Sequence, residues 1–311
     1  MELDKTTIVL RQRPLLDLID LSLVVFRNYW QPLLVYSSIG VLPFMLINFF
    51  VLKSLSDYDT ILVLDNQLLE ELPLRIRYVS FLMGMVFIQA PLAFIGVTYY
   101  LGQVLFIKQP SFRELGETIA KILAGLVLIL GVFRFGLLVW LVVALVPSDN
   151  YFNIWREVFL LGLVLCGSII SIRAVRPFAP EILLLEQPPL RSERKSKSGF
   201  SNSYQLRTRS LHRPLSGDLI GRSMGICLAI FLMLGSLTFG ELFISGVFFG
   251  VWQWEWWMDT ILFPLNLWLV ALWATVFRFL SYLDCRTRLE GWELDLRLRA
   301  EARRLSGATD S

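Results

Sequence analysis

The sequence predicts an all-α, polytopic integral membrane protein that forms a single membrane domain over residues 1–311. Long apolar runs without charge carry this prediction, together with Lys and Arg residues concentrated between alternate runs. Hydrophobic residues make up 55% of the chain and aromatic residues 14%, and the mean hydropathy is +0.60. These values are higher than in an average soluble domain. No segment between the runs is long and polar enough to fold as a separate soluble domain.

Six apolar runs are candidate transmembrane helices, since a helix of about 20 apolar residues crosses the hydrocarbon layer. We place the spans at about residues 32–52, 78–107, 121–147, 155–175, 223–250 and 259–283. The fourth span is long enough only if Arg156 and Arg173 extend their side chains to the two membrane interfaces.

The distribution of basic residues orients these spans. With a cytoplasmic amino terminus, the cytoplasmic segments hold 24 Lys and Arg residues and the outer segments hold four. The positive-inside rule therefore predicts that both termini are cytoplasmic. Between the last two spans, tryptophans gather at Trp252, Trp254, Trp256 and Trp257. We interpret this group as an aromatic belt at the outer interface, with a ligand cage as the alternative.

The amino-terminal segment and the cysteines carry little further signal. Residues 1–13 are polar and lack an apolar h-region, so we expect no removable signal peptide. Cys166 and Cys227 fall inside predicted spans, and Cys285 falls on the cytoplasmic side. Such scattered thiols predict neither disulfides nor a metal site, and we expect no cofactor.

The segment from Pro14 to Trp30 has the period of an amphipathic helix, with its polar residues gathered on one narrow face. We expect it to lie along the cytoplasmic interface. The chain then turns into the first span at Pro32.

Residues 187–222 form a predicted basic cytoplasmic loop, in which mobile basic side chains lie near anionic lipid headgroups. The candidate lipid contacts are Arg191, Arg194, Lys195, Lys197, Arg207, Arg209 and Arg213. Phe200 and Tyr204 are the only aromatic residues among these bases, too few for a stacking platform, so nucleic acid is not an expected partner. His212, the only histidine of the chain, is expected to be solvated in this loop.

Residues 284–305 are expected to continue the sixth span as a cytoplasmic amphipathic helix with two apolar stripes. One stripe contains Leu289, Trp292 and Leu296, and the other contains Leu294 and Leu298. A helix with two apolar faces is usually covered on both sides. This helix is therefore the candidate docking surface for a membrane-protein partner or a second copy of the chain.

Four segments carry a resemblance to a known family: LRQRPLLDLIDLSLVVFRNYWQPLL, SFRELGET, FAPEILLLE and FRFLSYLDCRTRLEGWELDLRLRAEA. Their most specific pattern consists of Tyr282, Asp284, Arg286, Arg288, Glu290, Gly291 and Trp292. Together the segments resemble bacterial membrane proteins grouped with the glycerophosphoryl diester phosphodiesterase membrane domain. The resemblance implies a non-catalytic membrane part whose role is poorly known.

Catalytic signals are sparse in this sequence. The soluble enzyme that lends the family its name needs several histidines and metal-binding carboxylates, whereas this chain has one histidine. The sequence contains no phosphate-binding P-loop, no HExxH and no Gly-x-Ser-x-Gly. A lipid-handling enzyme is the third-ranked hypothesis, and its candidate interfacial carboxylates are Asp17, Asp20, Glu181, Glu186 and Asp284.

Arg134 and Glu241 are the charged residues near the middle of predicted spans, where an ionised group is costly unless it is paired or solvated. We expect both to point into the bundle and to pair directly or through a bridge. The candidate bridging residues are Gln89, Tyr99 and Asn266. The pair fixes helix packing on one hypothesis and lines a polar transport cavity on the other.

Two glycine spacings, Gly246-x-x-x-Gly250 and Gly221-x-x-x-Gly225, are compatible with close helix packing, with a dimer contact as the alternative. The leading functional hypothesis is a non-enzymatic scaffold or accessory subunit of the bacterial inner membrane that docks partners through its cytoplasmic amphipathic helices. The competing hypothesis is a small-solute or lipid transporter or channel with a polar cavity around Arg134 and Glu241.

Overall fold

The computed structural model describes residues 13–56, 67–104, 112–132, 137, 139, 141, 154–168, 176–186, 204–252 and 257–290. All regular structure in these segments is helical, which confirms the all-α prediction for the described part of the chain. The elements are α1 (Leu15–Asn28), α2 (Trp30–Ser56), α3 (Gln67–Ala93), α4 (Ile95–Val104), α5 (Phe112–Leu126), η2 (Val127–Val132), α7 (Ile154–Ser168), α8 (Ala179–Glu181), η5 (Ile182–Glu186), α9 (Tyr204–His212), α10 (Ser216–Phe249), η6 (Met258–Leu262) and α11 (Phe263–Glu290). The η elements are short π-helical segments.

Four helical segments of the described chain are long and apolar enough to cross a membrane. They are Trp30–Leu52, Arg75–Ala93, Ser216–Phe249 and Met258–Glu290, which correspond to the predicted first, second, fifth and sixth spans. Much of the predicted third span lies outside the described residues. The predicted fourth span is represented by the 15-residue helix α7, and its continuation over 169–175 also lies outside them.

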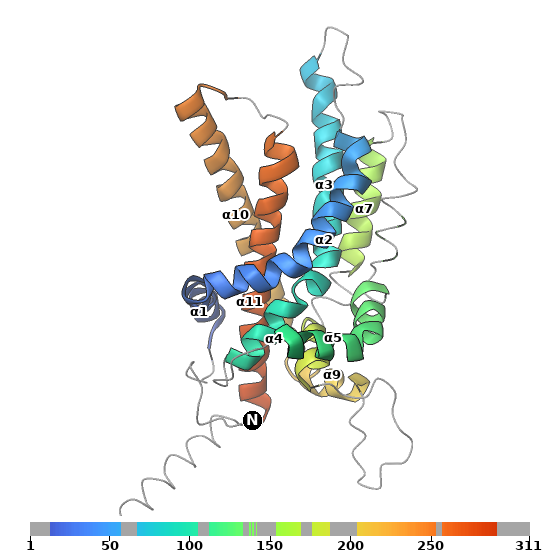
Figure 1. The fold of residues 1–311 in the computed structure, drawn as a ribbon, viewed down its shortest axis with the longest axis vertical. Coiled ribbons are helices and arrows are strands. Elements are labelled where there is room, and N and C mark those ends of the chain that lie inside the picture. Colours follow the sequence, from blue (N-terminus) through green and yellow to red (C-terminus); the bar gives the residue numbers. More distant parts are fainter. Residues whose placement is uncertain are drawn as a thin grey trace, which may run out of the picture.

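The long helices form a bundle with a layer of transverse helices at one end. Helices α3, α7, α10 and α11 run along the long axis, whereas α1, α5 and α9 lie across it (Figure 1). We call the end marked by α5, α9 and the last turns of α11 the basal end. Helix α11 is the central element, since it packs against α1, α3, α4 and α10.

Two of the predicted spans contain a bend or a break near a proline. Pro43 lies inside α2, whose first half runs across the bundle and whose second half rises beside α3 (Figure 1). The predicted second span also breaks, because α3 ends at Ala93 and α4 begins at Ile95, just after Pro91. Proline removes a backbone donor and its ring crowds the preceding turn, which accounts for both bends.

Glycines permit close contact where these bends meet. A methyl group added at Gly40 of α2 would overlap the backbone carbonyl of Ala93, at the end of α3. Gly96 of α4 similarly approaches the carbonyl oxygen of Tyr36 in α2, at 3.1 Å from an added Cβ. The crossing of α2 over the junction between α3 and α4 therefore depends on small residues.

The prediction that Gly246 and Gly250 form a helix-packing motif is wrong. Gly250 ends α10 in the left-handed region, at φ 69°, which glycine adopts without strain. Gly246 accommodates the ring of Trp252, which folds back from this turn. Of the second pair, Gly225 contacts Leu15 of α1, whereas a Cβ at Gly221 would meet nothing within 4 Å.

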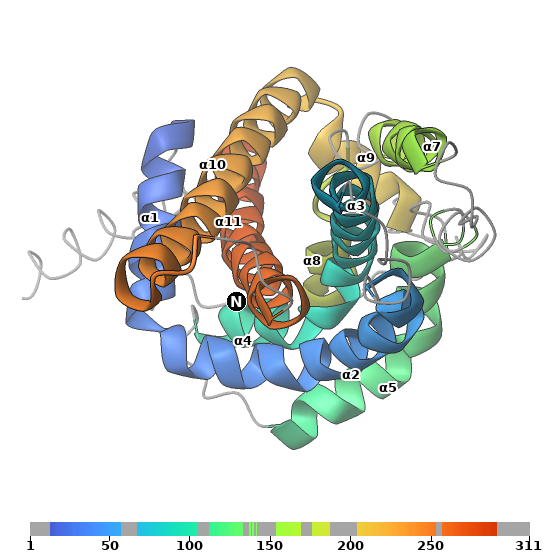
Figure 2. The ribbon, with the colours of Figure 1, turned by 90° about the horizontal axis from the view of Figure 1, so that it is seen from above.

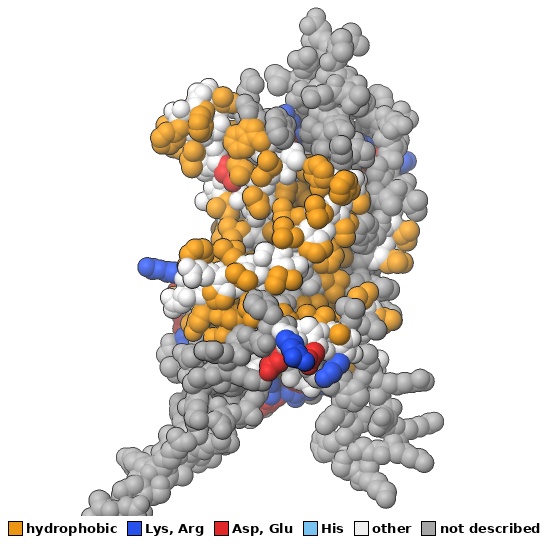
Figure 3. All heavy atoms as spheres, viewed as in Figure 1, with side chains coloured by type: hydrophobic (Ala, Val, Ile, Leu, Met, Phe, Trp, Pro, Cys, Tyr) orange, Lys and Arg blue, Asp and Glu red, His pale blue; other side chains and the backbone are white. Residues whose placement is uncertain are grey.

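Many large hydrophobic side chains are exposed on the surface of the bundle. Large side chains of α10 project outward, with Phe231, Phe248 and Phe249 each more than 70% exposed. Hydrophobic atoms cover much of the middle of the visible face, and a group of charged side chains lies toward the basal end (Figure 3). An exposed apolar surface of this extent is typical of a face that contacts lipid.

Candidate functional site: an apolar cavity bordered by arginines

A cavity of about 290 Å³ lies between α3, α10, α11 and the turn at Pro177 and Phe178. Residues of α3, α10 and α11 line the cavity, and α11 packs against both α3 and α10. Figure 2 shows these three helices from above. The walls of the cavity are mainly apolar and include Met83, Phe87, Ile226, Ile230, Leu234 and Leu267. A concave, largely apolar site with a few polar groups is the usual form of a ligand pocket.

The cavity extends along the helices. On α10 it is lined from Leu219 to Leu234, and on α11 from Leu267 to Ser281. At 1.5 Å per residue these stretches span about 21–23 Å. One leaflet of the hydrocarbon layer is about 15 Å thick. The cavity is therefore long enough to hold a hydrocarbon chain that lies parallel to the helices.

The polar lining is concentrated at the basal end of the cavity, where Arg222 and Ser223 of α10 face Arg278 and Ser281 of α11. Arg222 Nη2 donates to Asp284 Oδ2 at 2.7 Å and is 3.0 Å from Asp218 Oδ2. Both Arg222 and Asp284 are buried. A charge taken out of water is stable only beside an opposite charge, so this pair joins the bases of α10 and α11.

Asp284 also makes one further hydrogen bond and one further ion pair. Its Oδ1 accepts the backbone N–H of Arg13 at 2.8 Å, and its Oδ2 lies 2.9 Å from Arg288 Nε. Arg288 in turn donates to the backbone carbonyl of Arg13 at 2.8 Å. These contacts attach the segment that precedes α1 to the last turns of α11.

Arg278 is held by an acid from the short helix α8. Its Nε donates to Glu181 Oε1 at 2.7 Å, and Glu181 is fully buried. Pro180 stands in the first turn of α8, a position where the missing N–H costs nothing. The FAPE sequence thus forms a tight turn that directs a carboxylate at α11.

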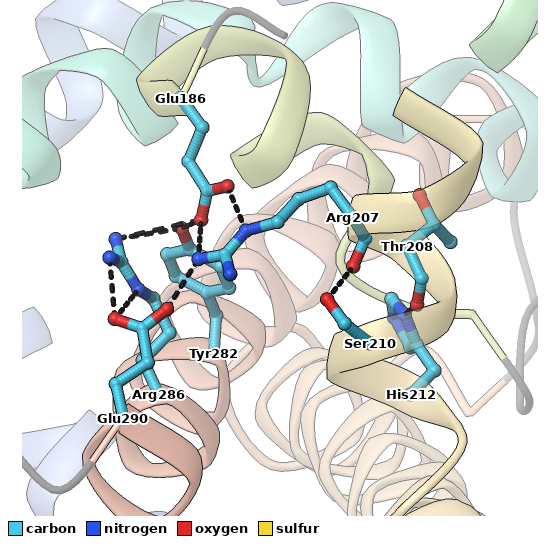
Figure 4. Close-up of polar contacts among 8 residues, drawn as sticks. All are labelled: Glu186, Arg207, Thr208, Ser210, His212, Tyr282, Arg286 and Glu290. Atoms are coloured by element: carbon cyan, nitrogen blue, oxygen red, sulfur yellow. Dashed lines mark hydrogen bonds and ion pairs between the residues drawn. The ribbon is translucent and has the colours of Figure 1, made fainter. Parts of the chain in front are cut away.

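A second ionic cluster lies nearby and joins η5, α9 and α11 (Figure 4). Arg207 of α9 bonds to Glu186 of η5 and Glu290 of α11, with one contact to Glu186 at 2.9 Å. Glu186 accepts the Tyr282 hydroxyl at 2.6 Å and lies 3.5 Å from Arg286. Arg286 donates to Glu290 at 2.7 and 3.0 Å. We call these five residues the basal cluster.

Arg207, one of the predicted lipid contacts, is held in the basal cluster, and its contact with lipid headgroups stays a prediction. Its hydrogen bond to Glu186 raises the pKa of the Arg207 guanidinium above its ordinary value, burial opposes this rise, and Glu290 adds to it. Arg209 and Arg213 are exposed, so their lipid contacts remain predictions. Arg191, Arg194, Lys195 and Lys197 lie outside the described residues. The predicted loop 187–222 also contains helix α9 and the start of α10.

The prediction that His212 is solvated is wrong. The residue is 3% exposed, and its ring lies 5.2 Å from that of Phe178. The backbone N–H of Phe178 donates to Nε2 at 3.4 Å, and Nδ1 is 2.7 Å from the carbonyl oxygen of Thr208 (Figure 4). This pairing requires the neutral tautomer with its proton on Nδ1, so His212 is a structural residue.

The predicted intramembrane pair is only partly described, because Arg134 lies outside the described residues. Glu241 accepts a hydrogen bond from Asn266 at 2.9 Å, which links α10 to α11, and neither residue lines the cavity. Gln89, another candidate bridge, pairs reciprocally with Asn48 at 2.8 and 2.9 Å. The third, Tyr99, is buried in α4.

The predicted docking face is described only at Leu289, which is 36% exposed. Trp292, Leu294, Leu296 and Leu298 lie outside the described residues. Of the acids assigned to a lipid-handling enzyme, Asp20 is exposed on α1, whereas Glu181, Glu186 and Asp284 all meet arginines of α9, α10 or α11. No group of three metal-ligating side chains was found within the described segments.

Sequence reasoning missed Arg222, Arg278 and Ser281 as a site. The local signal was present, because Arg278 and Ser281 are three residues apart and share a face of one helix. Arg222 is the last base before the long uncharged run of α10. What the sequence alone did not provide was the packing of α3 on the far side of these groups.

Comparison with known proteins found no matching family model, no matching curated protein and no matching solved structure. The segments FAPEILLLE and FRFLSYLDCRTRLE lie far apart in the sequence, yet they meet through Glu181 with Arg278 and Glu186 with Tyr282. The site is therefore interpreted from its geometry.

Proposed function

We propose that this chain is a non-enzymatic integral membrane protein that binds an amphiphile from the bilayer in the cavity between α3, α10 and α11. The observation that carries the proposal is the elongated apolar cavity, with its polar lining concentrated toward one end. A ligand with a hydrocarbon chain and a polar head matches this division. The activity would be lipid binding or transfer within the membrane of a bacterium.

The proposed source of the ligand is the bilayer itself. The exposed phenylalanines of α10 support a lipid-facing wall beside the cavity, and four segments have the length and composition of spans. We also propose that the basal end faces the cytoplasm, since the predicted cytoplasmic segments carry most of the basic residues. The polar end of the cavity would then lie in the cytoplasmic half of the membrane.

The absence of catalysis is part of this proposal. Asp284 and Glu186 accept hydrogen bonds from several donors, and Glu181 accepts one from Arg278. A general base needs access to a substrate proton, whereas these carboxylates are directed at arginines. Their arrangement favours structural ion pairing.

This function keeps the lipid ligand of the transporter hypothesis. The proposed binding site is now the cavity lined by Arg222 and Arg278 in place of the predicted cavity around Arg134 and Glu241. The scaffold hypothesis depends on the segment after Glu290 and stays a prediction. One observation favours it as a second candidate: the basal cluster anchors Glu290, so the following segment would leave from a fixed point. Removing residues 291–311 should then abolish co-purification of a partner while leaving lipid binding intact.

The experiment that tests lipid binding fills the cavity. Ala271 and Ala274 both line it from α11, and phenylalanine at both positions would occupy the volume of several methylene groups. The protein is reconstituted in nanodiscs with a palmitate analogue that carries a diazirine and an alkyne, and labelled peptides are identified by mass spectrometry. Since each buried methylene contributes about 0.8 kcal/mol, we expect labelling of cavity residues to fall more than about tenfold in the filled variant.

The matched control is Ser236→Phe, which adds the same ring to an exposed position of α10. This variant should label like the wild type. Equal labelling of the wild type and of a folded Ala271→Phe/Ala274→Phe variant would contradict the proposal.

A further inference from the structure

The basal end of the cavity holds three donors that lack acceptors. Arg222 Nε, Arg278 Nη2 and the Ser281 hydroxyl are buried, and within the described structure they have no hydrogen-bond partner. All three residues line the cavity. Buried donors without acceptors are uncommon in folded proteins and often mark a place where another molecule supplies the acceptor.

The three donors are close along the bundle. Arg278 and Ser281 lie one turn apart on the same face of α11. Arg222 is tied to Asp284, one further turn along α11, by the 2.7 Å ion pair. The donors therefore fall within about two turns, or roughly 9 Å along the helix axis. A group with several oxygens could accept from more than one of them.

The charged residues that line the cavity are all positive. Arg222 and Arg278 line the cavity, whereas their partners Asp284 and Glu181 are not among its lining residues. Glu181 Oε2 lacks a hydrogen-bond partner as well, so a ligand oxygen would compete with it for Arg278 Nη2. The residues that line this end of the cavity thus carry donors and positive charge, and no carboxylate is among them. Arginine suits phosphate and carboxylate oxygens because its donors form a planar fork.

We infer that the basal end of this cavity binds the anionic head, a phosphate or a carboxylate, of the amphiphile whose chain occupies the apolar part. The inference rests on the proposed function and adds the chemical class of the ligand. Arg278 and Arg222 contribute charge and donors, and Ser281 contributes a hydroxyl. A single hydroxyl has one oxygen to accept from these donors and no charge to match the arginines, and a quaternary ammonium group has no acceptor.

The test compares four probes that share one sixteen-carbon diazirine-alkyne chain and differ only in the head: an alkyl phosphate, a fatty acid, a fatty alcohol and an alkylphosphocholine. Each is photolysed with the reconstituted full chain, and labelling of cavity residues is quantified by mass spectrometry. We expect the anionic probes to label at least about tenfold more than the alcohol at equal concentration, since a hydrogen bond to a charged group is among the stronger ones. Comparing the phosphate with the fatty acid distinguishes a phosphate lipid from a free fatty acid.

Two variants connect this preference to the donors. Ser281→Ala removes one donor without changing charge, and Arg278→Gln combined with Glu181→Gln removes an ion pair without leaving a buried charge unpaired. Both should reduce the preference for anionic probes while the alcohol still labels. Thr275→Val is the matched control, because Thr275 lines the cavity but bonds to its own helix, to the carbonyl of Ala271 at 2.9 Å.

The outcomes separate the two proposals. Preferential anionic labelling that both variants weaken supports the inference. Equal labelling of the cavity by all four probes would overturn it and leave the proposed function standing. If no probe labels the cavity, the proposed function itself fails.

Discussion

Arg222 on α10 and Asp284 on α11 form a 2.7 Å ion pair at the base of the cavity, with both side chains removed from solvent. Sixty-two positions separate the two residues in the sequence. The pair fixes the height at which α10 meets α11, and one of its members, Arg222, lines the cavity. Its role in stability can be separated from its role in binding.

Asp284→Asn should destabilise the protein strongly, because it leaves the buried Arg222 without its main counter-charge. Breaking a buried pair on one side typically costs about 3–5 kcal/mol. Thermal unfolding in detergent measures the change. Asp20→Asn, on the exposed face of α1, is the control and should unfold at the temperature of the wild type. An Asp284→Asn protein as stable as this control would contradict a structural role for the pair.

Gly40→Ala should destabilise the crossing of α2 over the end of α3. The added methyl group would overlap the carbonyl oxygen of Ala93, and a backbone atom cannot move aside as a flexible side chain can. Overpacking of this kind usually costs about 1–3 kcal/mol. Gly235→Ala in α10 is the matched control, since a Cβ there meets nothing within 4 Å. The free energy of unfolding of both variants is measured by chemical denaturation. If both variants were as stable as the wild type, the close approach of Gly40 to Ala93 would be contradicted.

Asn48 and Gln89 should show coupled stability. Their side-chain amides exchange two hydrogen bonds between α2 and α3, at 2.8 and 2.9 Å, and both residues are buried. Hydrogen bonds between membrane helices are worth about 0.6–2 kcal/mol. A double-mutant cycle with Asn48→Ala and Gln89→Ala should return a coupling energy in this range. Additive effects would show that the amides do not interact in the membrane.

Arg207→Gln should lower the unfolding temperature more than Arg209→Gln does. Arg207 links Glu186 of η5 to Glu290 of α11, whereas Arg209, on the same helix, is exposed. Because Arg207 is partly accessible to solvent, we expect a loss of about 1–2 kcal/mol, against less than about 0.5 for a surface substitution. Equal unfolding temperatures of the two variants would show that the basal cluster does not stabilise the protein.

The proposed orientation predicts which end of the bundle reacts outside the cell. Single cysteines are placed at Arg209, near the basal end, and at Trp252, beyond the far end of α10, in a background without the native cysteines. An impermeant maleimide applied to intact cells should modify the cysteine at position 252 and spare the one at 209. The reverse pattern would invert the proposed topology.

The sequence predicted the helices whose apolar runs are long, and α10 and α11 lie where those runs placed them. The predictions from sequence were wrong where a residue packs against residues that are distant in the chain. His212 follows several bases in the sequence, but in the fold its partners are Phe178 and Thr208. The bend after Pro91 was readable in principle, since proline cannot continue a regular helix unchanged.

The candidate site was less predictable than the fold. Arg278 pairs with Glu181 across 97 positions, and periodicity within one segment carries no signal for such a contact. Arg134 and Glu241 were candidate site residues because they interrupt apolar runs, yet the described partner of Glu241 is Asn266, and neither Glu241 nor Asn266 lines the cavity. The cavity requires the packing of three helices from distant parts of the chain.

A cryo-electron microscopy map of the full chain in lipid nanodiscs is the most direct measurement of the central claim. We expect elongated non-protein density between α3, α10 and α11, with its broader end beside Arg222 and Arg278. A map in which α3 and α10 close against each other and leave no such density would contradict it.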